Sequence, residues 1–436
     1  MTSSATGMYR ASSQRMGRTA LVLAGGGVSG AVYEIGALRA IDDLLVNRTV
    51  NDFDIYVGTS AGALVSAFLA NGVSSVDLMR AVNGTHPLVS FPEAKHLFQL
   101  NATELLRRSL GLPKRLFSTA VEALANRGRI SVLDLIFSGL GGALPSGIYD
   151  LREYGEWLKH ALQVTGGSNR FDELPKELYI IATHLGNGQR AVFSAATPEV
   201  TISQAVMASS AVPVIYKPVR IGDAEYVDGG TRGNASLDLA IEHGAKLVVC
   251  INSLVPFDSE QWQHQQKGRK RPRFVSERGL EAVSAQVTRV LLHSGLKYQI
   301  KQLQRRHPDV DIILIEPRPD DPTMFFANIM RLQDRIAIAE HGFRSVSIDL
   351  AGSYDIIKET LARYGIQISR RLVRADLEAI QRSGHDPAVV QRILERSLRE
   401  NGLRSLPPVP ANPFVRLERV LADLESQLDR QIGGSR

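Results

Sequence analysis

Five short runs of apolar, β-rich residues, separated by helical segments, are the feature that most limits how this chain can fold. The runs are residues 19–24, 53–57, 178–183, 246–251 and 310–315. Each is mostly continuous in its apolar character, which is typical of strands covered on both faces. The alternation with helices predicts an α/β fold in which a mainly parallel central sheet is covered by helices on both sides.

The C-terminal part of the chain has a different pattern. From about residue 351 the strand pattern stops and the sequence becomes helical and charged, and SLPPVPANP at 405–413 is typical of a proline-rich linker. We therefore predict a flexible N-terminal tail over residues 1–17, one α/β domain over 18–350, and a helical extension over 351–436.

Composition limits the compartment and the partners. The single cysteine, Cys250, excludes an intramolecular disulfide and favours a reducing compartment. We identify no export signal and no window with the roughly 18 apolar residues of a membrane span, so we expect a cytoplasmic protein with only peripheral lipid contact. The basic cluster KGRKRPR at 267–273 is interpreted as a solvated loop, with attraction to an anionic membrane or to nucleic acid as the alternatives. Since no nucleic-acid motif accompanies it, we predict no nucleic-acid partner.

A glycine-rich segment, LVLAGGGVSG at residues 21–30, follows the first predicted strand and opens a helix at about Ala31. Its G-x-G-x-x-G spacing suits the pyrophosphate of a dinucleotide, and its backbone N–H groups equally suit the oxyanion of an acyl-transfer reaction. A dinucleotide site also needs an acidic residue at the end of the second strand, where this chain has Gly58 and Thr59. We therefore predict no nucleotide cofactor.

The same position carries Gly58-Thr59-Ser60-Ala61-Gly62, a G-x-S-x-G between a β-rich strand and an apolar helix that runs to about Asn71. Small neighbours allow a turn so sharp that the serine is exposed at the end of the strand. The helix N-terminus also favours developing negative charge there. This context predicts that Ser60 is a nucleophile.

A nucleophilic serine needs a base, and the residues leave two possibilities open. His184 and His243 are the histidine candidates for a Ser-His-Asp triad. Asp228, in YVDGGTRGN, is the other candidate, although DGG on its own is more often a simple turn.

Taken in order, four segments resemble the patatin-like phospholipases. The segments are GGGVSG at 25–30, GTSAG at 58–62, ASSAVPVIYKP at 208–218 and DGG at 228–230. The resemblance covers about residues 18–350. It implies a patatin-like three-layer fold and a lipid acyl hydrolase of the phospholipase A or lysophospholipase type, acting on carboxylic esters of membrane phospholipids or lysophospholipids without a metal or cofactor. The oligomeric state stays open. The alternatives are a non-catalytic patatin-fold lipid-binding or scaffold protein and a Ser-His-Asp esterase.

The resemblance also assigns roles to residues. It implies that Ser60 is the nucleophile and forms an acyl-enzyme, and that Asp228 is the base of a Ser-Asp dyad. The backbone N–H groups that would form the oxyanion hole belong to Gly25, Gly26, Gly27 and Val28. The glycines that support these motifs are Gly30, Gly58, Gly62, Gly229 and Gly230.

One position departs from the family pattern. The glycine loop of the family usually carries Arg or Lys where this chain has Ser29, and a hydroxyl cannot replace that positive charge. We expect either that another cation, such as Lys217 or Arg232, takes its place, or that headgroup preference and rate differ from those of the family.

The segment from about 84 to 150 places apolar residues beside prolines and glycines. A helical cover over the sheet is one interpretation. A lid or lipid-contacting surface, bordered by Lys95, Lys114 and Arg115, is the other.

Overall fold

The structure is a computed structural model that describes residues 17–110, 145–265, 274–326, 330 and 332–396. The basic cluster at 267–273, the proline-rich segment at 405–413, Lys114, Arg115 and all but the last residue of the predicted N-terminal tail lie outside the described residues.

An eight-stranded sheet forms the centre of the molecule, with the order β11-β10-β1-β2-β5-β9-β8 and with β6 paired to β5. Its strands are β1 (Arg18–Leu23), β2 (Ile55–Thr59), β5 (Glu177–His184), β6 (Arg190–Phe193), β8 (Val219–Ile221), β9 (Ala224–Asp228), β10 (Ala245–Ile251) and β11 (Asp311–Ile315). The five predicted strands correspond to β1, β2, β5, β10 and β11, and these pair in parallel. Strands β6, β8 and β9 are antiparallel additions at one side.

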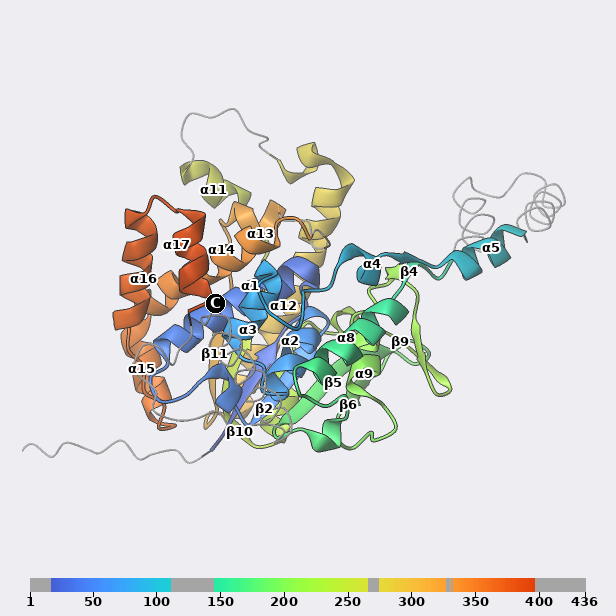
Figure 1. The fold of residues 1–436 in the computed structure, drawn as a ribbon, viewed down its shortest axis with the longest axis horizontal. Coiled ribbons are helices and arrows are strands. Elements are labelled where there is room, and N and C mark those ends of the chain that lie inside the picture. Colours follow the sequence, from blue (N-terminus) through green and yellow to red (C-terminus); the bar gives the residue numbers. More distant parts are fainter. Residues whose placement is uncertain (1–16, 111–144, 266–273, 327–329, 331, 397–436) are drawn as a thin grey trace, which may run out of the picture.

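The apolar runs are continuous because both faces of the central strands are buried. In β1, Leu21 and Leu23 belong to a core cluster with helix α1 (Gly27–Leu44). The alternate residues Ala20 and Val22 belong to a second cluster, which includes Leu296 of helix α12 (Gly279–Arg306). The predicted three-layer α/β architecture is confirmed (Figure 1).

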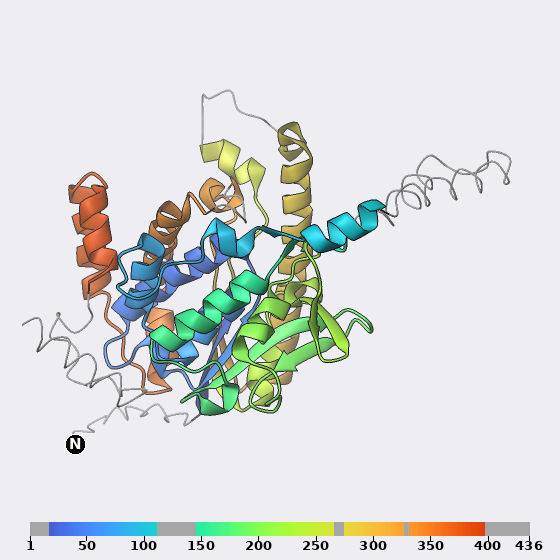
Figure 2. The ribbon, with the colours of Figure 1, turned by 45° about the vertical axis from the view of Figure 1, so that its right-hand side comes forward.

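The two helical layers differ in size. The larger layer contains α1, α2 (Ala61–Ala70), α3 (Ser75–Asn83), α8 (Arg152–Val164), α9 (Ile202–Ser209) and α14 (Arg335–Gly352), and the smaller contains α10 (Leu237–Glu242) and α12. Two short helices, α11 (Ser259–Gln265) and α13 (Pro322–Phe326), lie near the upper part of α12 (Figure 2). No described helix is both long and apolar enough to cross a bilayer.

Helix α1 carries the glycine-rich segment at its N-terminus and packs closely against α14. A Cβ atom at Gly36 would lie 2.2 Å from the Ala339 carbonyl oxygen, and one at Gly342 would lie 2.6 Å from the Tyr33 carbonyl oxygen. The glycines therefore let the two backbones approach closely, which fixes the position of α1 against the rest of its layer.

A second, three-stranded sheet lies on the side of the molecule opposite the C-terminal helices (Figures 1 and 2). It has the order β3 (Gln99–Leu100), β4 (Gly147–Asp150) and β7 (Val214–Tyr216). Strands β3 and β4 and helices α4 (Ala94–Leu97) and α5 (Ala102–Leu110) belong to the segment predicted to be a cover or lid, whereas β7 lies outside that segment.

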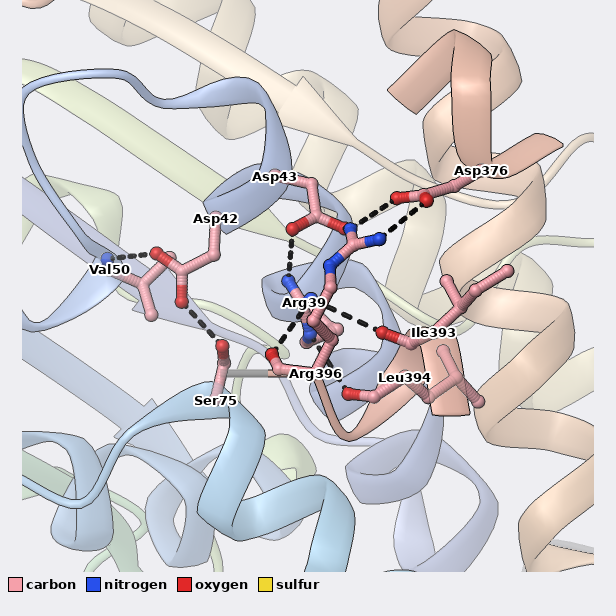
Figure 3. Close-up of polar contacts among 9 residues, drawn as sticks. All are labelled: Arg39, Asp42, Asp43, Val50, Ser75, Asp376, Ile393, Leu394 and Arg396. Atoms are coloured by element: carbon pink, nitrogen blue, oxygen red, sulfur yellow. Dashed lines mark hydrogen bonds and ion pairs between the residues drawn. The ribbon is translucent and has the colours of Figure 1, made fainter. Parts of the chain in front are cut away.

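The C-terminal helices are α15 (Tyr354–Ala362), α16 (Arg371–Arg382) and α17 (Pro387–Leu394), and a polar network connects α16 and the end of α17 to α1 (Figure 3). The fully buried Arg39 donates to Asp43 Oδ1 at 2.5 Å and to the Leu394 carbonyl at 3.0 Å. Arg396 pairs with Asp376 of α16 through two hydrogen bonds of 2.8 and 2.6 Å. A helical C-terminal region is thus present, whereas the domain boundary at residue 350 stays a prediction.

Candidate active site

Ser60 occupies a one-residue turn between strand β2 and helix α2. Its backbone has φ 54° and ψ −117°, a conformation that non-glycine residues rarely adopt. The turn is possible because Gly58 and Gly62, two positions before and after Ser60, have no side chains. A Cβ at Gly58 would lie 2.6 Å from the Ala63 Cα, and one at Gly62 would lie 2.2 Å from the Leu23 carbonyl oxygen. Strain of this kind concentrates at functional sites, which makes Ser60 a candidate functional residue.

Ser209, at the end of α9, fixes this turn. The Ser60 backbone N–H donates to Ser209 Oγ at 2.7 Å, and Ser209 Oγ donates to the Ile181 carbonyl in β5 at 2.6 Å. One buried hydroxyl therefore connects three elements. Sequence reasoning missed Ser209 as a site residue, although it lies within ASSAVPVIYKP, one of the four segments that carried the family resemblance.

Asp228 ends strand β9, and the structure brings it beside Ser60. Its N–H donates to the Ala211 carbonyl at 2.9 Å, and its carboxylate accepts a hydrogen bond of 2.7 Å from the Gly230 N–H. A Cβ at Gly229 would lie 2.4 Å from the Ile181 carbonyl oxygen, so this position must be glycine for β9 to approach β5. The DGG motif therefore does more than form a turn, because it fixes the carboxylate next to Ser60.

The Asp228 carboxyl group is buried, and its pKa is raised to about 6. Burial is the main cause, since desolvation disfavours the charged form. Hydrogen bonding with the Ser60 side chain and with the Gly230 N–H partly offsets this rise in the pKa. A carboxylate with such a pKa is ionised at neutral pH and is a stronger base than an exposed aspartate.

The glycine-rich loop lies directly against the serine turn. A Cβ at Gly25 would lie 3.3 Å from the Ser60 Cβ, and Gly27 and Val28 line the same cleft as Ser60. Gly25 donates its N–H to the Asn234 carbonyl at 3.2 Å. This corrects the expectation that the Gly25 N–H is one of the oxyanion donors, because it already donates to the Asn234 carbonyl. The candidates that remain are Gly26, Gly27 and Val28, at the start of α1, where helical N–H groups have no partner within the helix.

Two asparagines support the loop, and sequence reasoning missed them. Asn234 Nδ2 donates to Asn252 Oδ1 at 2.9 Å, and the Asn234 carbonyl accepts the Gly25 N–H. Ser253 lies so close that a Cβ at Gly26 would be 2.1 Å from its hydroxyl and one at Gly30 would be 2.7 Å from it. Gly26 and Gly30 are therefore required by close contacts on the side of the loop that faces β10.

An apolar cleft opens above Ser60. It encloses about 480 Å³, part of it open to solvent. None of the described residues that line it is charged. The lining comes from helices α1, α2, α4 and α8, from strand β7 and from the segments that precede α2, α4, α8, β7 and α14. Its residues are Gly27, Val28, Ala31, Ser60, Ala61, Leu64, Phe91, Pro92, Leu97, Leu151, Tyr154, Ser210, Val212, Tyr216 and Met330. Such walls suit a long apolar group.

The histidine candidates lie elsewhere. His184 Nδ1 accepts the Gly186 N–H at 3.1 Å, and its ring packs against Tyr226. His243 follows α10, where its ring packs against Tyr179. Neither lines the cleft. Among the described residues there is also no cluster of three or more His, Cys, Asp or Glu side chains that could hold a metal ion.

The cations proposed to replace the missing charge at Ser29 also lie outside the described lining of the cleft. Ser29 is buried in the first turn of α1. Lys217 pairs with Asp150 at 2.5 Å, and Arg232 is exposed and donates to the Gly188 carbonyl at 3.0 Å. Within the part of the chain that the structure describes, the N-termini of α1 and α2 are the remaining sources of positive potential beside Ser60.

The comparisons with known proteins agree with this geometry. A family model described as "Patatin-like phospholipase" matches residues 21–241. The "Probable lipid hydrolase 463L" of Invertebrate iridescent virus 6 is 22% identical over 227 residues, which are 52% of this chain and 64% of that protein. The chain thus spans less than two thirds of that relative's length.

Among solved structures, VipD from Legionella pneumophila aligns with 77% of this chain and 67% of its own, at 16% identity and a TM-score of 0.33. This likeness is too low to support an argument. The family model, in contrast, matches half of the chain and includes the glycine loop, Ser60 and Asp228. This chain belongs to the patatin-like phospholipase family.

Proposed function

We propose that this protein is a serine lipid acyl hydrolase that cleaves carboxylic esters of membrane phospholipids or lysophospholipids through a Ser60–Asp228 dyad. One observation carries the proposal: the strained Ser60 and the buried Asp228 carboxylate lie together beside the glycine-rich loop, which offers backbone N–H groups. The apolar, uncharged cleft above Ser60 supports an acyl chain as the group held during the reaction. The printed name of the viral relative, a lipid hydrolase, agrees with this class of activity.

In the first half of the proposed reaction, Ser60 Oγ attacks the ester carbonyl carbon and Asp228 accepts its proton. A tetrahedral intermediate forms with its negative charge on the former carbonyl oxygen. When the intermediate collapses, the bond to the leaving alcohol breaks and Asp228 returns the proton to that alcohol. The acyl group remains on Ser60, and the deacylated lipid leaves.

In the second half, a water molecule attacks the acyl-enzyme while Asp228 accepts one of its protons. The intermediate then collapses, the bond to Ser60 Oγ breaks, and Asp228 returns the proton to the serine. The products are a free fatty acid and the regenerated enzyme. General-base assistance of this kind is typically worth about 10²–10⁴ in rate.

The negative charge of each intermediate needs donors that are already in place. The N–H groups of Gly26, Gly27 and Val28 fulfil this role in the proposal, and the N-terminal dipole of α1 adds positive potential although Ser29 carries no charge. Removal of one donor from such a site typically costs about 10²–10³ in rate. A donor set made of backbone atoms cannot be removed by mutation, so the support of the loop by Asn234 is the part that can be tested.

The test is a hydrolysis assay on a panel of phospholipids and lysophospholipids, with release of fatty acid as the readout. We expect wild-type activity, loss of activity to background in Ser60→Ala, and a loss of about 10²–10⁴ in Asp228→Ala. The double variant His184→Ala/His243→Ala is the matched control and should keep its activity. Loss of activity in this control would favour a Ser-His-Asp esterase instead.

The non-catalytic alternative rests on Ser29, the position at which the chain departs from its family. If wild type hydrolyses no lipid of the panel and no soluble ester, while it still binds lipid, the scaffold function replaces the hydrolase. A variant with the charge of the family, Ser29→Arg, that gains activity from an inactive parent would support the same conclusion.

A further inference from the structure

The small sheet β3–β4–β7 continues the wall of the cleft out to the molecular surface. In its register Leu100 is opposite Tyr149, Tyr149 is opposite Tyr216, and Gly147 is opposite Val214. Directly paired residues of neighbouring strands point to the same face of a sheet. Leu100, Tyr149 and Val214 therefore share a face with Tyr216, which lines the cleft above Ser60.

Burial decreases along this face with distance from the cleft. Tyr216 is buried, Tyr149 is half-buried, and Leu100 and Val214 are 62% and 76% exposed. The Tyr149 ring packs against Phe98 at a centroid distance of 5.4 Å. We call Phe98, Leu100, Tyr149 and Val214 the outer face. Exposed apolar side chains that extend from a binding cleft to the molecular surface are typical of an interaction site.

Val214 adds an independent observation, because its exposure is combined with backbone strain. Its φ is +73°, which is a genuine outlier for a β-branched residue. Strained residues persist where the surrounding structure forces them and a function uses them. Val214 is paired with Gly147 in the small sheet, and its apolar side chain is exposed to solvent near Tyr216 of the cleft.

Cations outnumber carboxylates where β4 and β7 end, whereas Glu104 lies at the other end of β4, where it accepts hydrogen bonds from Ser146. Asp150, which follows Tyr149, pairs with Lys217 at 2.5 Å and with Arg152 at 2.9 Å. Two cations therefore share one carboxylate, and these three groups together keep a charge of +1. Aromatic and aliphatic side chains next to cations are the combination that binds the boundary between acyl chains and phosphate headgroups.

We propose that the outer face is the surface by which this protein docks on a phospholipid bilayer, so that an acyl chain can move from the bilayer into the cleft past Tyr216. The purpose of the docking rests on the proposed function, but the binding itself requires no catalysis. Helix α12 carries another exposed apolar row, formed by Leu280, Val283, Val287 and Leu291. No described residue of α12 lines the cleft, so we assign the bilayer to the outer face.

The experiment is flotation of the full chain with vesicles of phosphatidylcholine, with and without phosphatidylglycerol, in a Ser60→Ala parent so that no lipid is hydrolysed. The test variant adds Leu100→Ser and Val214→Gly. The matched control adds Leu280→Ser and Leu291→Ser, which change the exposed row of α12. We expect the partition coefficient to fall at least tenfold in the test variant and to stay within twofold in the control. Tenfold corresponds to about 1.4 kcal/mol, or about two methylene groups in lipid.

Folding is checked by the melting temperature. Val214→Gly removes the side chain that makes a positive φ unfavourable, so the variant Val214→Gly alone should not melt below its parent and should still bind vesicles more weakly. Three results would overturn the proposal: no flotation of the parent, equal flotation of the test variant, or loss of flotation only in the α12 control. Light scattering measures the oligomeric state of both proteins. If the parent is a dimer and the test variant is a monomer, the outer face binds a second copy of this chain and not a bilayer.

A failure of the docking proposal can be told apart from a failure of the proposed function. If only docking is wrong, the Leu100→Ser/Val214→Gly variant with Ser60 intact hydrolyses vesicles and a soluble short-chain ester as wild type does. If only the hydrolase function is wrong, neither substrate is cleaved, but the parent still floats and the test variant does not.

Discussion

Replacement of the buried base by its neutral isostere, Asp228→Asn, should make the protein more stable while it removes the activity. The pKa of Asp228 is raised from its ordinary value of 3.8 to about 6, mainly by burial. At about 1.4 kcal/mol per pKa unit, ionisation of this group costs the folded state about 3 kcal/mol. The asparagine side chain has no charge to bury, and its carbonyl oxygen can still accept the Gly230 N–H.

The difference in stability between wild type and Asp228→Asn depends on pH. At about pH 4 the Asp228 carboxyl group is protonated in the folded protein and partly protonated in the unfolded protein, so its penalty is only about 0.5 kcal/mol. As the pH rises from about 4 to about 6, the unfolded state releases its proton first, and the stability of wild type falls relative to that of the variant. Above about pH 6 the difference stays constant at its full value.

Urea denaturation at about pH 4 and at pH 7 measures this difference. We expect the unfolding free energy of Asp228→Asn to exceed that of wild type by about 3 kcal/mol at pH 7 and by only about 0.5 kcal/mol at the lower pH. Asp223→Asn, at the exposed turn between β8 and β9, is the control and should change stability by no more than about 0.5 kcal/mol at either pH. A variant that is less stable than wild type at pH 7, or a difference that does not depend on pH, would refute the reasoning.

Three further predictions concern the base, the serine turn and the C-terminal helices. Because Asp228 must be ionised to accept a proton, kcat/KM on a soluble ester should fall about tenfold per pH unit below about pH 6, and a flat profile down to about pH 4.5 would contradict this role. Ser209→Ala leaves the Ser60 N–H and the Ile181 carbonyl without their partner, so denaturation should show a loss of about 1–3 kcal/mol, with kcat lowered as well; unchanged kcat would exclude a positioning role. Arg39→Met leaves Asp43 buried without its main partner and should cost about 3–5 kcal/mol in the same assay, whereas a neutral result would show that the network in Figure 3 contributes little.

The sequence predicted the parts of the fold whose pattern is local. Strands β1, β2, β5 and β10 are buried on both faces, so each appears as a continuous apolar run, and the edge strand β11 is half-buried but equally apolar. Strands β8 and β9 were not predicted, because they are short and only partly buried, and their residues resemble those of a loop. The small sheet was also missed, since β3 and β7 are too short for a periodic signal and form only through distant pairing.

The residues of the candidate site also differ in whether the sequence could predict them. Ser60, Asp228 and the glycines of their motifs could be identified because the motifs are contiguous and occur in the order of a known family. Ser209 and Asn234 act through hydrogen bonds to residues far away in the sequence, and Ser60 and Ser209 are 149 positions apart. No spacing rule predicts such a contact. The link between Arg396 and Asp376, which the sequence presents only as charged helical residues, depends on tertiary packing in the same manner.

The central claim is that Asp228 activates Ser60 as a nucleophile. Its most direct measurement is the rate at which a fluorophosphonate probe reacts with the protein, with the modified peptide identified by mass spectrometry. We predict one adduct, on Ser60, with a rate that falls about 10²–10⁴-fold in Asp228→Asn and is unchanged in His184→Ala. An adduct on another residue, or a wild-type rate of Ser60 labelling in Asp228→Asn, would contradict the claim.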